Sequence, residues 1–278
     1  MTARRRPMEL ADRVARAVRD VGVLLREWRS DSRAVSGVWD GLQFKARADS
    51  MAHEALSERL RAIEPGTPVV SEEDPASILA PRPPRYWLID PIDGTASYAH
   101  GFPGYVTQAA LIDASRPVLA AVYAPEPDIG YRAVRGLGAT ANGRALPRLG
   151  AAPPGSGVLI DNTPAPTGVA RAAYAMFGYT DYAECGSIAL KLCRIAEGSA
   201  HLFVKDVPVR DWDIAAPHLL LHETGGSLRR LDGTPFDYSG GYEHTGLIGA
   251  ADPATGAAVA EWHRSGQPSR ERPRPRTG

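Results

Sequence analysis

Apolar residues recur every three or four positions in the first part of the chain, which is the spacing of a helical face. Between Met8 and Trp28 this face consists of Leu10, Val14, Val18, Val21 and Leu25. A second helix is predicted over 52–63, and it ends before Pro65-Gly66, which is a helix stop signal. The polar stretch 30–48 between the two helices predicts a loop or a hairpin.

Beyond the second helix the pattern changes to short apolar runs separated by Pro, Gly and Asp. These runs are typical of β-strands and cover 68–70, 86–89, 106–112 and 118–124. The segment 147–155 is rich in turn-forming residues and is the best candidate for a boundary. We therefore predict an N-terminal lobe of helices and sheet over 1–147.

The second part of the chain alternates between the two patterns. Helical spacing returns over 188–195 and 214–220, with a strand-like run at 201–204 between them. This alternation predicts an α/β lobe over 148–264. The segment 265–278 contains no large apolar residue, so we expect it to be a disordered tail.

Charge and composition exclude several classes of function. Lys plus Arg and Asp plus Glu number 32 each, so no overall positive field attracts a nucleic acid polymer. No run approaches the ~18 to 20 apolar residues of a membrane helix. Cys185 and Cys193 lie eight positions apart in a predicted helix and its entry, where they are interpreted as small core residues. With no secretory signal at the N-terminus, a cytoplasmic location is expected.

Carboxylates gather in three separate segments, each beside a predicted strand end or helix start. They are Ser71-Glu72-Glu73-Asp74, Asp90-Pro91-Ile92-Asp93 and Asp211-Trp212-Asp213. Buried carboxylates are costly without partners, and hard divalent cations such as Mg2+ prefer oxygen ligands. The three segments together therefore indicate a magnesium site.

The middle segment continues into Gly94 and Thr95, whose backbone amides are candidates for binding phosphate. Gly94 allows close backbone approach and Thr95 is placed to open a helix, whose free amides bind phosphate. We expect Pro91 to lie in a tight turn that directs Asp90 and Asp93 toward one point. Taken alone, Asp-Gly-Thr is more often a turn before a capped helix, so the interpretation depends on all three segments.

These motifs resemble the inositol monophosphatase superfamily over about residues 8 to 250. The strongest matches are Trp87 to Thr95, His100-Gly101-Phe102-Pro103, Trp212 to Ala216 and Glu223-Thr224-Gly225-Gly226. The resemblance implies a fold of alternating αβαβα layers. It also implies a lithium-sensitive, Mg2+-dependent phosphomonoesterase that acts on a small phosphate ester and forms a homodimer.

The resemblance also assigns roles to single residues. The metal ligands fall on Glu72, Asp90, the Ile92 carbonyl, Asp93 and Asp213. They would hold two Mg2+ ions, which activate a water and stabilise the leaving oxygen. Glu72 and Thr95 would orient the attacking water. Asp49 would support Thr95 or hold a third Mg2+, although the family's Thr shortly before that Asp is absent here.

The expected substrate contacts are Asp93, Gly94, Thr95, Gly186, Ser187 and Asp206. Asp206 stands where inositol monophosphatases place a glutamate for ring hydroxyls, which favours a polyol or cyclitol phosphate such as inositol monophosphate. The motifs Ser71 to Pro75 and Gly186 to Lys191 instead resemble 3'(2'),5'-bisphosphate nucleotidases. In that alternative Lys191 or Lys205 meets a second phosphate, whereas surface lysines are usually only solvated.

Two other classes of protein were considered. A non-catalytic metal- and phosphate-binding regulator is disfavoured by the complete set of carboxylates. A Ser-His-Asp hydrolase is disfavoured because no Gly-x-Ser-x-Gly motif occurs. Among the histidines, we expect His100 to position backbone, and His218 and His222 to lie on a helix surface or at an interface.

Overall fold

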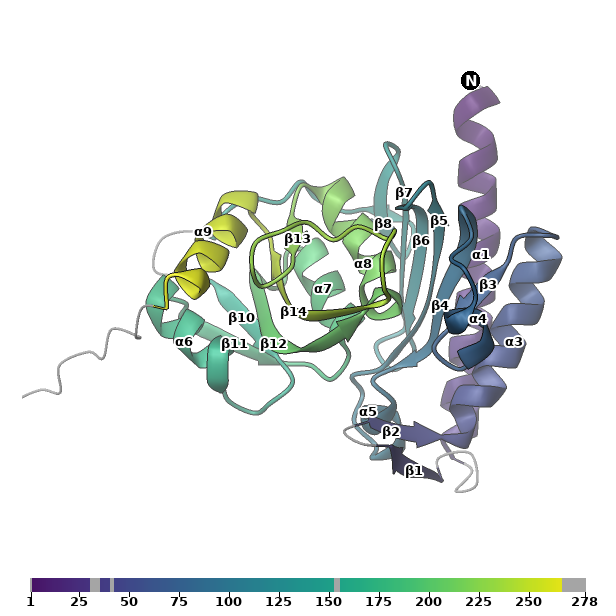
Figure 1. Ribbon diagram of the computed structural model, residues 1–278, viewed down its shortest axis with the longest axis horizontal. Helices are drawn as coiled ribbons and strands as arrows, with labels where there is room; N and C mark the ends of the chain where they lie inside the picture. The colour runs from purple at the N-terminus through teal and green to yellow at the C-terminus, as the bar shows by residue number, and fades with distance from the viewer. Residues whose placement is uncertain (1, 31–35, 41–42, 153–155, 267–278) are drawn as a thin grey trace, which may run out of the picture.

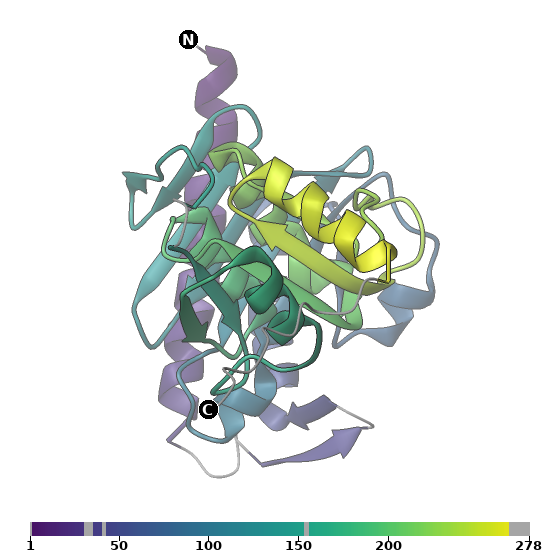
Figure 2. The ribbon, with the colours of Figure 1, turned by 90° about the vertical axis from the view of Figure 1, so that its left-hand side faces the viewer.

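The computed structural model describes residues 2–30, 36–40, 43–152 and 156–266. Helices and sheets alternate in layers, in the order α1 and α3, a larger sheet, α7 and α8, a smaller sheet, and α6 and α9 (Figure 1). Figure 2 shows α9 crossing the outer face of the smaller sheet. The αβαβα arrangement expected from the sequence is confirmed.

Within the described residues the larger sheet has seven strands in the order of the sequence, from β3 to β9. The pairs are antiparallel except for β3 and β4, which run parallel. The strands are β3 Val69–Ser71, β4 Arg85–Asp93, β5 Val106–Asp113, β6 Arg116–Ala124, β7 Ile129–Val134, β8 Gly138–Ala141 and β9 Arg144–Ala145. The four apolar runs predicted as strands thus belong to β3 to β6.

Helices α1 (Thr2–Trp28) and α3 (Arg47–Ile63) cover one face of the larger sheet. The alternation along β4 explains how: Trp87 and Ile89 pack against these helices, while Tyr86 and Leu88 face the middle layer. Between the two helices lie β1 (Gly37–Asp40) and β2 (Gln43–Ala46), which pair as a hairpin. Of the predicted loop or hairpin at 30–48, residues 31–35 and 41–42 lie outside the described residues.

The smaller sheet has the strand order β11-β10-β12-β14-β13 in the part of the chain that the structure describes. Its strands are β10 Val158–Asp161, β11 Asp181–Glu184, β12 Leu202–Arg210, β13 Ser227–Arg229 and β14 Glu243–Ala250. Helices α6 (Gly168–Phe177) and α9 (Pro253–Arg264) pack on its outer face. The division into two lobes at 147 and 148 stays a prediction, and most of the predicted tail, 267–278, lies outside the described residues.

The middle layer consists of α7 (Ile188–Ala196) and α8 (Asp211–Thr224). Buried residues occur on every side of α8, because both sheets pack against it. His218 was expected on a helix surface or at an interface, and it is partly buried between the layers, where its Nδ1 lies 2.9 Å from the Tyr238 hydroxyl. His222 is exposed as expected. Cys185 and Cys193 are buried and free, as predicted.

Two short helices flank the edge of the larger sheet: α4 (Pro75–Leu79) follows β3, and α5 (Thr95–Ala99) follows β4. Helix α5 ends at His100, whose Nδ1 lies 2.7 Å from the Ala96 carbonyl oxygen, in line with the expected backbone role. None of the helices that the structure describes has the length and apolar character to cross a membrane.

Candidate functional site

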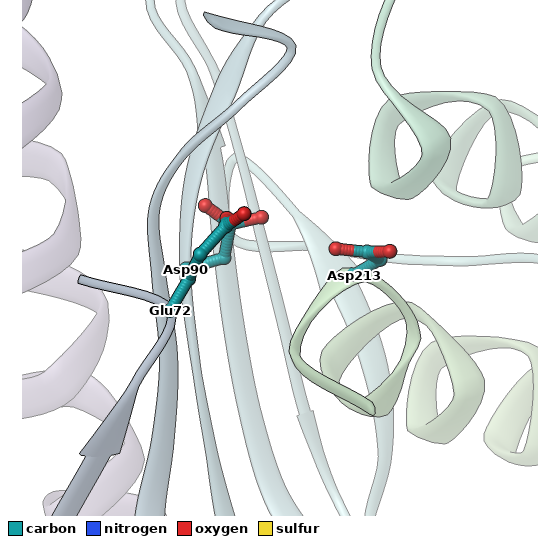
Figure 3. Close-up of side chains that lie close together, drawn as sticks. All are labelled: Glu72, Asp90 and Asp213. Carbon is teal, nitrogen blue, oxygen red and sulfur yellow. The ribbon is translucent and has the colours of Figure 1, made fainter. Parts of the chain in front are cut away.

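Three carboxylates from distant parts of the sequence meet at one edge of the larger sheet. Glu72 directly follows β3, Asp90 belongs to the parallel neighbour β4, and Asp213 lies in the first turn of α8. Each offers an oxygen within 4.8 Å of the other two. Figure 3 shows Asp213 reaching from α8 toward Glu72 and Asp90. We call these three residues the carboxylate trio.

The end of β4 differs from the predicted turn. The strand continues through Pro91 to Asp93, and the register with β5 shifts between Asp90 and Asp93. Asp90 Oδ1 accepts a hydrogen bond of 3.0 Å from the Ile92 amide within this bulge. A β-bulge re-aims side chains at a strand end. Pro91 therefore lies in a bulge and not in a tight turn, because a bulge needs no ladder donor there.

Asp93 does not join the carboxylate trio. Its Oδ2 accepts hydrogen bonds of 2.6 Å from both the Ser187 hydroxyl and the Ala189 amide at the start of α7. Asp93 thus caps a helix of the other half of the chain while also lining the cavity described below. Gly94 follows with φ +92°, and a Cβ there would lie 2.8 Å from the Gly104 carbonyl oxygen. Only glycine fits this position without strain.

Thr95 connects the trio's strand to α3. Its hydroxyl lies 3.1 Å from Asp49 Oδ1 and 3.0 Å from the Ile92 carbonyl oxygen. Asp49 is almost fully buried in the first turn of α3. When Thr95 donates its hydrogen to Asp49, the lone pairs of the hydroxyl remain free to accept a hydrogen bond from a water. The predicted pairing of Asp49 with Thr95 is therefore present.

The electrostatics of the trio fit a divalent cation. Burial and the charge of Glu72 raise the pKa of Asp90 well above its usual range, since only 1% of Asp90 is exposed. Burial and the charge of Asp93 raise the pKa of Asp213. Clustered buried carboxylates of this kind are stabilised by a bound cation, and oxygen ligands suit Mg2+. The donor set is consistent with the metal site predicted from the sequence.

A cavity of about 290 Å³ opens above the trio. One side is acidic and comes from the larger sheet and its flanking turns, and the other is basic and comes from the smaller sheet and α7. The acidic side includes Glu72, Glu73, Asp90 and Asp93. The basic side includes Lys191, Lys205 and Arg210.

Both lysines are held by neighbouring groups. Lys191 Nζ donates to the carbonyl oxygens of Cys185 and Gly186, at 2.9 and 3.0 Å. Lys205 Nζ lies 3.0 Å from Asp161 Oδ1 and 2.6 Å from Asn162 Oδ1. An ammonium group has three hydrogens, so these oxygens account for two of the three hydrogen bonds that each lysine can make, and the Lys191 ammonium also lies 4.9 Å from the centre of the Phe203 ring. Burial lowers the pKa of Lys191 to about 8.

The cavity includes some of the predicted substrate contacts and not others. Asp93, Gly94, Thr95 and Gly186 line it. Ser187 is fully buried, and its hydroxyl binds Asp93 instead of facing the cavity. Asp206 is exposed on β12, whereas its neighbours Lys205 and Val207 line the cavity.

The sequence contained a signal for Lys191 that the prediction did not use. Lys191 falls between Ile188 and Ile195 on the apolar stripe of α7, where a charged residue needs a reason to be buried. The lysine is only 1% exposed. Lys205 has no such signal, since its partners Asp161 and Asn162 come from another strand.

Comparisons with known proteins agree with this architecture. The model of the inositol monophosphatase family matches residues 9–265. The 3'(2'),5'-bisphosphate nucleotidase CysQ of Escherichia coli strain K12 is 33% identical over 196 residues, covering 69% of this chain and 78% of that protein. Inositol monophosphatase 1 of Solanum lycopersicum is 32% identical over 158 residues, covering 54% of this chain and 58% of its own.

A solved structure shares the fold. The inositol monophosphatase from Anabaena (Nostoc) sp. PCC 7120 superposes with a TM-score of 0.74 and 21% sequence identity, covering 95% of this chain and 98% of its own. The family match spans nearly the whole chain, including all three segments of the carboxylate trio. The chain therefore belongs to the inositol monophosphatase family of metal-dependent phosphoric monoester hydrolases.

Proposed function

We propose that this phosphatase removes phosphate from a small molecule that carries a second anionic group, of the class of 3'(2'),5'-bisphosphate nucleotides. The observation that carries the proposal is the basic side of the cavity, where Lys191, Lys205 and Arg210 line the same cavity as the carboxylate trio. A phosphate bound at the metal site leaves a second anion free to meet these cations. This function is the alternative that the sequence left open.

The relatives support the same choice. The nucleotidase CysQ matches this chain over more of its length than does the tomato inositol monophosphatase, at a similar identity. The cyclitol phosphate, which the sequence favoured, was inferred mainly from Asp206, and Asp206 is not among the residues that line the cavity. A neutral polyol would also offer no anion to the ammonium of Lys191, which is held by the carbonyl oxygens of Cys185 and Gly186.

We further propose that the trio, with Asp93 and the Ile92 carbonyl as neighbouring oxygen donors, holds two Mg2+ ions. When bound, such ions polarise the phosphoryl group and increase the acidity of water. The trio offers three carboxylates within 4.8 Å, and burial, followed by the repulsion between neighbouring carboxylates, raises the pKa values of Asp90 and Asp213, a cost that a bound cation relieves.

The protein's own groups would then orient the reactants. Thr95, with its hydrogen directed to Asp49, accepts a hydrogen bond from the attacking water, and Glu72 accepts a second one. The amides of Gly94 and Thr95 lie along the cavity and are placed to donate to phosphate oxygens. Because both lysines are held by fixed oxygen atoms, the second anion meets pre-positioned donors.

The test is the release of inorganic phosphate from 3'-phosphoadenosine 5'-phosphate and from myo-inositol 1-phosphate, each with Mg2+. We expect kcat/KM to be at least tenfold higher for the bisphosphate. Equal turnover, or a preference for the inositol ester, would contradict the proposal. The homodimer, the lithium sensitivity and the cytoplasmic location stay predictions of the family resemblance.

A further inference from the structure

A buried ionic network joins the first turn of α8 to the half of the chain that carries Glu72 and Asp90. Its centre is Asp211, the first residue of α8, which is fully buried. Asp211 Oδ2 lies 2.8 Å from Arg82 Nη1, and Asp211 Oδ1 lies 2.7 Å from His244 Nε2. Arg82 lies between α4 and β4, and His244 belongs to β14. One carboxylate therefore connects three segments.

Arg82 is fixed from several directions. Its guanidinium carbon lies 3.8 Å from the centre of the Tyr242 ring. Its Nη1 also donates to the Tyr86 hydroxyl at 2.7 Å and to the Tyr238 carbonyl oxygen at 3.0 Å. A planar guanidinium that is stacked and hydrogen-bonded has little freedom to move. Arg82 thus provides Asp211 with a partner of defined position.

His244 completes the network as a hydrogen-bond donor. Arg230 Nε donates to His244 Nδ1 at 3.3 Å, so the ring hydrogen lies on Nε2 and points to Asp211. Both oxygens of Asp211 therefore contact groups from other elements, although Oδ2 meets Arg82 in an ion pair and makes no hydrogen bond within the described residues. These contacts of Asp211, the first residue of α8, restrain the first turn of the helix.

Two residues further on, Asp213 is the member of the trio that α8 supplies. Its Oδ2 accepts a hydrogen bond of 2.8 Å from the Arg210 amide, which fixes the carboxylate relative to the same turn. Glu72 and Asp90 come from β3 and β4, on the other side of the cavity. The distance from Asp213 to its two partners is therefore set by where the first turn of α8 lies.

The buried ion pair between Arg82 and Asp211 is expected to contribute little to the free energy of folding. Arg82 Nε and Nη2 are buried without a hydrogen-bond partner in the described residues, so part of the cost of removing the cation from water stays uncompensated. Buried ionic groups of this kind are best attested where they fix one arrangement among several. In this protein, the arrangement that the network would fix is the position of Asp213.

We propose that Arg82 and Asp211 are positioning residues that hold Asp213 at the distance from Glu72 and Asp90 that a divalent cation requires. This inference rests on the proposed metal site and adds residues that touch neither metal nor substrate. Metal sites tolerate only small displacements of their ligands, so a loosened first turn of α8 should weaken the binding of cations.

The test measures Mn2+ binding by isothermal titration calorimetry in Asp211→Asn and Arg82→Gln. We expect each variant to bind Mn2+ at least tenfold more weakly than the wild type. At saturating Mg2+, the KM for a phosphate ester should stay within threefold of the wild-type value. The control is Arg85→Gln, which removes the ion pairs with Glu64 and Asp113 at the start of β4 and should keep wild-type Mn2+ affinity.

Thermal melting separates positioning from general stability. Variants that melt earlier but bind Mn2+ like the wild type would overturn the inference. If either variant fails to fold, Arg82→Lys keeps the charge but loses the planar stacking on Tyr242, and wild-type Mn2+ affinity in that variant would overturn the inference as well. A wild-type protein that binds no Mn2+ would instead refute the metal site on which both proposals depend.

Discussion

The two sides of the cavity have opposite charge and different origins in the chain. The acidic side is local in origin, since Glu72 and Asp90 follow or belong to parallel neighbours in one sheet, and only the third member of the trio, Asp213, comes from the distant α8. The basic side is assembled from α7 and β12. Lys191 on α7 is held by a carbonyl oxygen of Cys185, just before that helix, and Lys205 on β12 is held by Asp161 from a distant part of the sequence. The difference fits our proposal that the acidic side performs the hydrolysis and the basic side selects the ester.

The largest effect is expected on the acidic side. Asp90→Asn removes one charge from the trio while keeping the size of the side chain. We expect kcat to fall about a thousandfold or more with every phosphate ester, because the phosphoryl group loses its electrostatic stabilisation. Phosphate release at saturating Mg2+ measures this change, and circular dichroism checks the fold. Retention of a tenth of the wild-type kcat would be incompatible with the assigned role.

A smaller effect is expected at Thr95. In Thr95→Val the hydroxyl that lies 3.1 Å from Asp49 is lost, so the water has no acceptor there. We expect kcat to fall about a hundredfold with little change in KM. Steady-state kinetics separate the two constants, and Thr95→Ser, which keeps the hydroxyl, serves as the control. A drop confined to KM would show that Thr95 binds substrate instead of orienting water.

On the basic side the expected effect depends on pH and on the substrate. Burial lowers the pKa of Lys191 to about 8, so the lysine is charged below that pH and neutral above it. We expect the KM for 3'-phosphoadenosine 5'-phosphate to be flat up to about pH 7 and to rise about tenfold by pH 9.5, since a charged hydrogen bond is lost. Adenosine 3'-phosphate, without the second phosphate, should lack this rise. If the KM values of the two substrates changed with pH in the same way, Lys191 would not bind the second phosphate.

The smallest effect concerns α8, which lies between the two sides. Burial lowers the pKa of His218 to about 4. As the pH falls below about 6.5, His218 therefore becomes protonated in the unfolded chain but stays neutral in the folded protein until the pH approaches 4. His218 thus favours folding fully above pH 6.5, and stability declines as the pH falls from 6.5 toward 4, by roughly 2 to 3 kcal/mol.

Urea unfolding between pH 4 and 7.5 tests this point. His218→Gln should flatten the decline, whereas His263→Gln, at an exposed position of α9, should keep the wild-type profile. An unchanged decline in His218→Gln would mean that other groups cause the acid sensitivity.

Much of the acidic side could be predicted from the sequence because its parts are local. The run Trp87-Leu88-Ile89 predicts a strand with one face to each layer, and the carboxylate follows at its end. The orientation of Asp93 could not be predicted, since its partner Ser187 lies 94 positions away. The bulge in β4 was also missed, because alternation along a strand does not reveal a shift of register.

The basic side was harder to predict for the same reason. The register of β12 with β14 shifts between Lys205 and Pro208, and the sequence does not reveal such a shift. The family resemblance selected Asp206, while Lys205 is the residue in the lining. The difference of one position matters because an aspartate in the lining would suit hydroxyl groups of a substrate, whereas a lysine suits an anion.

The central claim is that the basic side selects a second anionic group, and Lys205→Gln tests it most directly. The measurement is the ratio of kcat/KM for 3'-phosphoadenosine 5'-phosphate to that for adenosine 3'-phosphate, with Mg2+ at pH 7. We predict a ratio above ten for the wild type and a ratio reduced about tenfold in the variant, with the turnover of adenosine 3'-phosphate preserved. The same ratio in both proteins would contradict the account.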